Sequence, residues 1–330
     1  MLLKKYSSYK IGGRCNYLFF PENTYNLKSL LEFAKSRKLT PLVFGYGTNI
    51  LFPDKPSKEY CFISLRNLRD VALNENKLYL GSGVPISILA VIGILSASSK
   101  FYFSHLLPGS TGGAIYMNAR CYGGEISEIV KRIFYLDENL SLREIEKEKC
   151  SFDYKDSIFQ KKNWVILGAE FEIENKLEKE NFDKIMKFLK KIKYKNLSDL
   201  KDFYNMFNLK KISKFFGIKD LPDKIVEIEN DRVSKHHFDF PSCGSYFKNN
   251  YAAGKPTGKI IDELGLKGYR VGGAKVSDFH ANFILNYKNA TKNEVVTLME
   301  FLQKKVYEKE GFIPEPEVKI VDEKPASPKA

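Results

Sequence analysis

The chain has 330 residues, more than one hydrophobic core usually serves, so two or three packed domains are expected. Hydrophobic residues make up 43% of it and aromatic residues 14%, and this composition excludes an intrinsically disordered protein. The net charge of +13 would attract polyanions, so a nucleic-acid-binding protein stays open as one alternative.

Membrane, secreted and metal-dependent classes are disfavoured. The most apolar stretch, residues 86–95, has about half the length that a membrane span requires, so we predict a buried helix and no membrane contact. The N-terminus shows no secretory signal, and a cytoplasmic protein is expected. The five cysteines are scattered and only two of the four histidines are adjacent, so neither disulfides nor a metal site are expected.

Short strands alternate with helices and glycine loops in the N-terminal half. An apolar strand over residues 41–44 runs into the loop Gly45-Tyr46-Gly47-Thr48-Asn49, which Ile50 follows. Further elements are predicted, in order, as strands over residues 60–65 and 77–80, a helix over 85–98, a helical run over 114–119, and strands over 131–136 and 164–173. This mixture predicts an α+β protein.

A second glycine cluster, Pro108–Gly113, precedes the helical run, and Gly123-Gly124 follows it. After Glu174 the sequence becomes rich in Lys, Glu and Asn with helical spacing, so we place a domain boundary near residue 175. Residues 322–330 carry no apolar pattern and are predicted to form a loose tail.

Much of the positive charge lies between Lys184 and Lys214. There the lysines alternate with apolar residues such as Ile185 and Leu189 at helical spacing, a pattern typical of an amphipathic helix with one solvated face. This pattern favours a solvated surface over a nucleic-acid patch.

Glycine loops bring backbone N–H groups close to a phosphate, because glycine adopts positive φ at little cost and has no side chain in the way. The first loop has Ile50 where a dinucleotide fingerprint needs its third glycine, and neither loop has the Gly-Lys-Ser/Thr of a P-loop. One loop alone would more often be an ordinary turn. Three loops with neighbouring hydroxyl and amide groups indicate a long cofactor that has a pyrophosphate and a polar ring edge; these groups belong to Thr48, Asn49, Ser110, Thr111 and Asn118.

Seven segments, in order along residues 11–320, resemble the motifs of the UDP-N-acetylenolpyruvoylglucosamine reductase family. They are IGG at 11–13, GYGTNIL at 45–51, PGSTGGAIYMNARCYGGEI at 108–126, FDYKDSIF at 152–159, GSYFKN at 244–249, GLKGYRVGGAKVSDFHANFILN at 265–286 and PEPEVKI at 314–320. The His-Ala-Asn-Phe at 280–283 is similar to the shorter subtype of that family.

The resemblance implies a two-lobed FAD-binding domain of the vanillyl-alcohol oxidase (PCMH) type and a C-terminal α+β substrate-binding domain. The expected division is lobe 1 over residues 1–55, lobe 2 over 56–175, the substrate domain over 176–321 and the tail over 322–330. It also implies non-covalent FAD, NADPH as the reductant, and a UDP-sugar as the small-molecule substrate. A monomer without nucleic-acid partners is expected.

The same resemblance assigns residues to the two ligands. FAD is expected at Gly45, Tyr46, Gly47, Thr48, Asn49, Ile50, Pro108, Gly109, Ser110, Thr111, Gly112, Gly113, Asn118 and Gly123. The substrate is expected at Tyr154, Asn249, His280 and Lys235, and Arg232 is an alternative to Lys235.

The implied reaction reduces an enolpyruvyl ether to a lactyl ether, and negative charge builds on the substrate carboxylate as it proceeds. Ser245 matches the family's proton donor, and Glu317, if protonated, could donate a hydrogen bond to that carboxylate. Lys155 stands where the family usually has arginine; it keeps the charge but loses the planar two-pronged grip. Arg14 and Arg120 stay open as substitutes for the missing guanidinium.

Two further alternatives keep the fold and change the chemistry. One is an FAD-dependent oxidase of the same fold, and the other is a flavin-binding homologue that lost its activity when Lys155 replaced arginine. The segment over residues 195–224 looks longer than the subtype usually carries, and we expect an insertion on the substrate domain.

Overall fold

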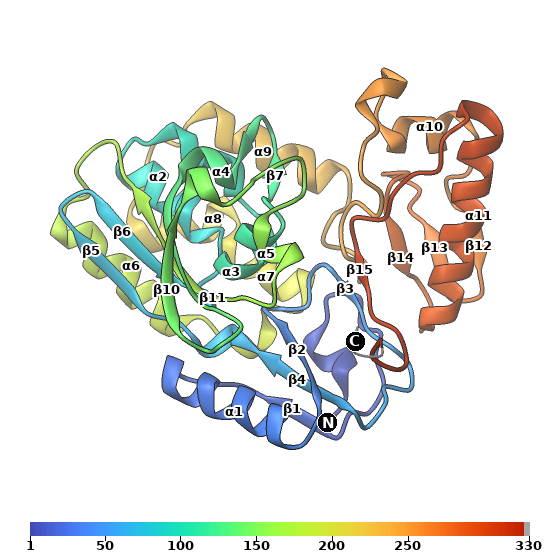
Figure 1. Ribbon diagram of the computed structural model, residues 1–330. Coiled ribbons are helices and arrows are strands. Elements are labelled where there is room, and N and C mark those ends of the chain that lie inside the picture. Colours follow the sequence, from blue (N-terminus) through green and yellow to red (C-terminus); the bar gives the residue numbers. More distant parts are fainter. Residues whose placement is uncertain (327–330) are drawn as a thin grey trace.

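The structure, a computed structural model, describes residues 1–326 apart from the side chain of Lys195. An N-terminal lobe begins the chain (Figure 1). Its three-stranded parallel sheet has the order β1 (Tyr17–Phe19), β4 (Tyr60–Ser64), β2 (Thr40–Phe44). The sheet is covered by α1 (Thr24–Ser36), which Asn23 caps by accepting a hydrogen bond from the Asn26 N–H at 2.8 Å. Every residue of β4 is buried, as expected of the central strand of a parallel sheet.

The second lobe is built on a five-stranded antiparallel sheet. Its order is β10 (Leu142–Glu146), β9 (Val130–Leu136), β11 (Val165–Glu172), β6 (Lys77–Gly81), β5 (Val71–Asn74). The buried helix predicted over residues 85–98 is present as the shorter α2 (Ile88–Leu95), and α3 (Thr111–Tyr116) begins directly after the second glycine cluster. Within residues 1–326, no helix is long and apolar enough to cross a membrane.

The C-terminal body contains a three-stranded antiparallel sheet with two helices. The sheet has the order β12 (Arg270–Val271), β13 (Ala274–Val276), β14 (Ile284–Asn286), and the helices are α10 (Thr257–Glu263) and α11 (Lys292–Glu310). A capping box between Thr291 and Glu294 starts α11, and Gly311 ends it with a left-handed φ of 75°. The chain then returns to the first lobe, where β15 (Lys319–Ile320) pairs in parallel with β3 (Ile50–Leu51).

The lysine-rich segment is not the single amphipathic helix that its spacing predicts. It forms four short elements, α6 (Lys179–Lys191), η5 (Tyr194–Asn196), α7 (Leu200–Phe207) and α8 (Leu209–Phe216), before α9 (Asp223–Ser234). Asn208 separates α7 from α8, because its side chain accepts a hydrogen bond from the Lys211 N–H at 2.9 Å and caps a new helix. The exposed lysines do form a solvated face.

These helices belong to the second lobe, in contrast to the expected domain boundary at residue 175. Their apolar residues, Phe203 and Ile212 among them, share one buried core with Leu78 of β6 and Ile133 of β9. Figure 1 shows α6 to α9 beside the five-stranded sheet and apart from the C-terminal body. The change of core therefore falls near residue 238, and the segment over residues 195–224 covers the flavin lobe instead of the substrate domain.

The start of the predicted tail makes contacts. The Glu323 carbonyl accepts a hydrogen bond from the Ser57 N–H at 2.7 Å, and its carboxylate accepts one from the Lys55 N–H at 2.8 Å. The remainder of that prediction, residues 327–330, lies outside the described residues.

Candidate active site

A cavity of about 800 Å³ lies where the two lobes and the C-terminal body meet. Both glycine loops, the turn at Tyr154-Lys155, the segment after α9 and the loop that carries Ser245 line it. The segment before β15 contributes Glu317. Residues far apart in the sequence therefore share one site.

The glycine loops make one wall of this cavity, and their close approach requires glycine. A Cβ on Gly45 would lie 2.1 Å from the Ser110 Oγ, so the first loop packs directly against the second. Gly47 has a φ of +66°, where a Cβ would also meet the Tyr6 carbonyl oxygen at 2.3 Å. Within residues 1–326, the N–H groups of Gly47, Thr48 and Asn49 donate no intramolecular hydrogen bond. Free donors on a cavity wall fit the pyrophosphate of FAD.

Most of the predicted cofactor residues line this cavity, but Thr111 and Asn118 do not. The Thr111 hydroxyl donates to the Val84 carbonyl at 2.9 Å, and the Asn118 amide donates to the Asp153 carbonyl at 3.0 Å. Both side chains are buried and hold neighbouring loops together, so the prediction that they contact the cofactor is wrong. Tyr46 is 1% exposed and its hydroxyl donates to the Gly83 carbonyl, which leaves only its backbone for a cofactor.

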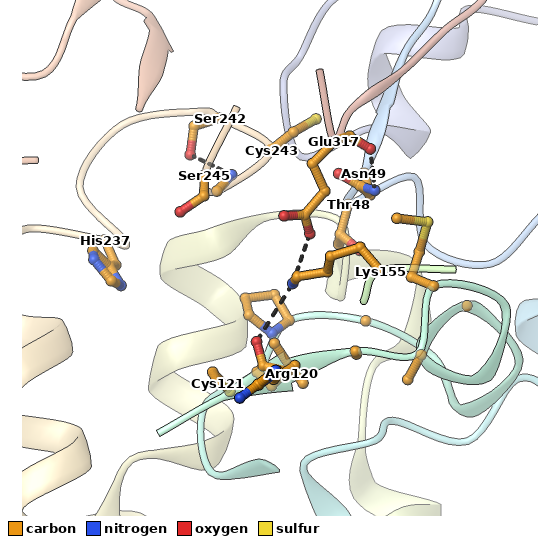
Figure 2. A pocket seen from close by; sticks show the side chains of 18 of the residues that line it. Thr48, Asn49, Arg120, Cys121, Lys155, His237, Ser242, Cys243, Ser245 and Glu317 are labelled. Carbon is orange, nitrogen blue, oxygen red and sulfur yellow. Dashed lines mark hydrogen bonds and ion pairs between the residues drawn. The ribbon is translucent and has the colours of Figure 1, made fainter. Parts of the chain in front are cut away.

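The three predicted catalytic residues do come together. The Lys155 Nζ lies 2.9 Å from the Glu317 Oε1, and both side chains are largely shielded from solvent (Figure 2). Lys155 has a left-handed φ of +56°, imposed by a tight turn in which Asp153 and Asp156 exchange backbone hydrogen bonds of 3.1 Å. The Glu317 carbonyl accepts a hydrogen bond from the Asn49 side chain at 3.0 Å, which ties it to the first glycine loop.

Ser245 lies opposite this ion pair on the cavity wall (Figure 2). It forms an isolated antiparallel bridge with Phe283 and follows Gly244, whose φ of +77° only glycine adopts easily. The preceding loop is fixed to the N-terminal lobe, because the Ser8 hydroxyl donates to the Ser242 carbonyl at 2.6 Å. The backbone therefore fixes the position of Ser245.

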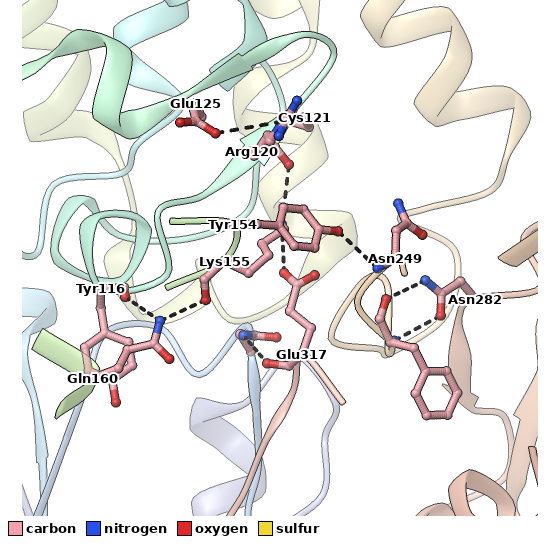
Figure 3. A network of polar contacts seen from close by, with 12 residues as sticks. Tyr116, Arg120, Cys121, Glu125, Tyr154, Lys155, Gln160, Asn249, Asn282 and Glu317 are labelled. Carbon is pink, nitrogen blue, oxygen red and sulfur yellow. Dashed lines mark hydrogen bonds and ion pairs between the residues drawn. The ribbon is translucent and has the colours of Figure 1, made fainter. Parts of the chain in front are cut away.

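The predicted substrate residues line the far part of the cavity. The Asn249 N–H donates to the Tyr154 hydroxyl at 3.1 Å, which connects the C-terminal body to the second lobe (Figure 3). Burial raises the pKa of Tyr154 to about 12, so its hydroxyl keeps its proton at neutral pH. Lys235 is ion-paired with Asp231 at 2.6 Å, and His280 lies nearby.

Two cavity residues escaped the site prediction or received only a secondary place in it. Arg232 is buried, stacks over the Tyr122 ring at 4.9 Å, and lies 3.5 Å from the Cys121 Sγ. His237 stacks on Phe283 with 4.6 Å between ring centroids. Burial, with the nearby Arg232 as the next cause, lowers the pKa of His237 to about 3. The adjacent His236-His237 pair was the available signal in the sequence.

The remaining chemistry of the described residues is limited. Across residues 1–326, no group of three or more His, Cys, Asp or Glu side chains is placed to hold a metal ion. The five cysteines are free thiols. Burial raises the pKa of Cys243 to about 12, which makes this thiol a poor nucleophile.

Comparison with known proteins identifies the family. Residues 235–321 match the model of the UDP-N-acetylenolpyruvoylglucosamine reductase C-terminal domain. The reductase of that name from Borrelia garinii is 35% identical over 316 residues, which is 96% of this chain and 90% of that protein. The chain belongs to the UDP-N-acetylenolpyruvoylglucosamine reductase family. The reductase from Caldanaerobacter subterraneus is 33% identical and covers 98% of this chain and 92% of its own.

The crystal structure of the reductase from Thermus caldophilus has the same fold, with a TM-score of 0.69, 21% identity and 98% of each chain covered. Family membership confirms the predicted fold, the oxidoreductase class, and FAD and NADPH as cofactors. The family model begins at residue 235, close to the change of core near residue 238.

Proposed function

We propose that this chain reduces UDP-N-acetylglucosamine enolpyruvate to UDP-N-acetylmuramate, a step in peptidoglycan precursor synthesis. The observation that carries the proposal is the meeting of Ser245, Glu317 and Lys155 in one cavity, next to glycine loops that fit FAD. These residues come from three distant segments of the chain. Chance would not assemble the same three side chains that the family's chemistry requires.

The chemistry divides between the cofactor and the chain. When bound, FAD passes reducing equivalents from NADPH to the vinyl carbon of the substrate. Ser245 donates its hydroxyl proton to the other carbon, which is a strongly basic centre once charge has built up. Lys155 stabilises the negative charge that develops on the substrate carboxylate, and the low polarity of a closed cavity strengthens that interaction.

Glu317 has a different partner before the substrate arrives. In the structure its carboxylate accepts the Lys155 ammonium at 2.9 Å. A glutamate that donates a hydrogen bond must carry a proton, so the ion pair has to open when a substrate carboxylate takes its place beside Lys155. Exchange of one carboxylate for another lets the site select an anionic substrate.

The far part of the cavity suits the UDP group. Asn249, Tyr154 and His280 offer hydrogen-bond donors there, and Lys235 adds positive charge. Hydrogen bonds from these groups to diphosphate oxygens would orient the sugar toward Ser245. We further propose that the protein acts as a monomer in the cytoplasm without nucleic-acid partners.

The structure favours a working reductase over the two rivals with the same fold. A chain that had lost its activity would have no reason to keep a cation against Glu317, yet Lys155 occupies that place with a short ion pair. An oxidase that acts on an alcohol has no use for a proton donor opposite a carboxylate-binding cation.

Anaerobic spectroscopy of the holoenzyme tests the proposal. The flavin of the wild-type protein is first bleached with NADPH, and the enolpyruvyl UDP-sugar is then added. We expect the flavin absorbance to return within seconds. Ser245→Ala should slow this return by about 10²-fold or more while leaving NADPH bleaching unchanged, because only proton donation is lost. A wild-type flavin that stays bleached would exclude the reductase activity.

A further inference from the structure

The inference concerns the binding of the substrate carboxylate, and it rests on the proposed function. Lys155 has to serve two partners. Its ammonium pairs with Glu317 at 2.9 Å and also donates to the Arg120 carbonyl at 3.4 Å. A lysine presents a single point of charge, whereas a carboxylate is held most specifically by two parallel N–H donors of a guanidinium.

Arg120 places a guanidinium beside this ion pair. It lies on β7 (Arg120–Cys121), directly after the second glycine cluster and α3, and it lines the cavity. Its backbone touches Lys155 through the hydrogen bond just described, and Figure 3 shows the two residues close to each other. Its side chain, 46% exposed, is free to move within the open cavity.

The side chain of Arg120 is only weakly engaged. Its sole ion-pair partner within residues 1–326 is Glu125, and the distance from the Arg120 Nε to the Glu125 Oε2 is 3.8 Å. The other Glu125 oxygen accepts hydrogen bonds from Ser127 and Asn118. The two terminal nitrogens of Arg120 thus have no hydrogen-bond partner in the described part of the chain. They remain available for a ligand.

The other arginines are less suitable. Arg14 is exposed near the N-terminus, where it bridges to Leu2, and it does not line the cavity. Arg232 is buried against Tyr122 and Cys121, where it has little freedom to follow a reacting carboxylate. Of the two arginines that the sequence left open, only Arg120 reaches the site.

We propose that Arg120 binds the carboxylate of the enolpyruvyl group through its terminal nitrogens, and that it supplies the planar grip that Lys155 lacks. The substrate carboxylate then lies between two cations, one planar and one a point charge. Glu317 is released from Lys155 as this carboxylate enters. Arg120 is accordingly a catalytic residue for the same reaction.

Binding measurements on the oxidised holoenzyme test this role. Two ligands are compared by titration calorimetry: the enolpyruvyl UDP-sugar and UDP-N-acetylglucosamine, which lacks the carboxylate. Arg120→Met should weaken binding of the first by about 10- to 100-fold and leave the second unchanged, since a charge-assisted hydrogen bond is lost only with the carboxylate ligand. Arg14→Met is the matched control and should change neither value.

A second substitution separates geometry from charge. Arg120→Met combined with Lys155→Arg returns a guanidinium to the neighbouring position, and binding of the carboxylate ligand should recover at least in part. Equal weakening of both ligands, no weakening, or no recovery in the double variant would each overturn the assignment of Arg120. A wild-type enzyme that the substrate does not reoxidise would instead remove the proposed function, and this one with it.

Discussion

His237 is a titratable side chain that the fold keeps neutral. It lies between Phe283 and His280, with ring centroids 4.6 Å and 5.6 Å away, and its Nε2 is buried without a hydrogen-bond partner. Burial and the positive charge of Arg232 both oppose a second proton on the ring, which is why its pKa falls to about 3. The folded protein therefore refuses a proton that the unfolded chain accepts.

This difference makes stability depend on pH. The unfolded imidazole titrates near pH 6.5, so folding is unaffected by this group above that pH and is increasingly penalised as pH falls from about 6.5 toward 3. Between pH 7 and pH 5 the free energy of unfolding should fall by about 2 kcal/mol because of His237 alone. Urea unfolding of His237→Phe, which keeps the ring stack, should show a correspondingly smaller loss.

The neighbouring His236 provides the control. Its side chain is 39% exposed and paired with Asp239, so His236→Phe should retain the pH dependence of the wild type. An equal loss of stability in the wild type and His237→Phe would show that other buried groups, such as His105, carry the effect.

Single residues were the most predictable part of the site where a motif fixes them. Ser245, Glu317 and Lys155 meet as the motifs implied, because each lies in a short segment whose backbone is tightly held. Thr111 and Asn118 were wrong for a physical reason: a hydroxyl or amide beside a glycine loop can face a ligand or bond a neighbouring backbone carbonyl. Sequence does not distinguish these two directions.

At the scale of elements, the two glycine loops act as a unit. The absence of a side chain on Gly45 lets the first loop lie against the Ser110 side chain of the second. Ser110 is also the cap of α3, where its hydroxyl accepts a hydrogen bond from the Gly113 N–H at 3.3 Å. The cofactor wall thus depends on contact between loops and helix start.

Gly45→Ala should therefore separate the loops. The added methyl would lie 2.1 Å from the Ser110 Oγ, far inside van der Waals contact, so the purified protein should retain much less FAD than the wild type. The absorbance ratio at 450 and 280 nm measures the retained fraction. Adding Ser110→Ala removes the nearest atom and leaves a 3.0 Å contact to the Ser110 Cβ, so flavin content should partly recover. A Gly45→Ala protein with full flavin would contradict this account of the wall.

The helices α6 to α9 show where prediction of elements failed. Strands such as β4, β9 and β11 follow their predicted spans closely, because apolar runs bounded by turns are a local signal. The helical spacing of residues 184–214 was also genuine. The pattern did not reveal that Asn208 divides it, nor that the apolar face meets the sheet of the second lobe, because the choice of packing partner is made by residues distant in sequence.

At the scale of the whole molecule, the C-terminal segment completes the flavin site. The strand β15 pairs with β3 and carries Glu317 to Asn49 of the first glycine loop. Ser8 fixes the loop before Ser245 from the same lobe. The substrate domain is therefore held to the first lobe at both ends of its catalytic machinery, which keeps the proton donor and the ion pair in register.

Charge is distributed unevenly over this assembly. Within the described chain, seven lysines and arginines and only three carboxylates line the cavity. The lysines of α8, such as Lys210, lie instead on the outer face of the helices that cover the second lobe. Both substrates of the proposed reaction are polyanions, so attraction into the cavity should speed their association.

Steady-state kinetics at varied salt tests this attraction. Raising NaCl from 20 to 200 mM shortens the screening length from about 20 Å to about 7 Å, so kcat/KM for the UDP-sugar should fall several-fold while kcat holds. Lys259→Gln, at the cavity, and Lys210→Gln, on α8, remove one exposed charge each. The first should lower kcat/KM at low salt clearly more than the second, because a charge acts on the incoming substrate mainly within a screening length. Equal effects would mean that the net charge of +13 acts as a whole, and the outer lysines would then become the first place to look for a nucleic-acid partner.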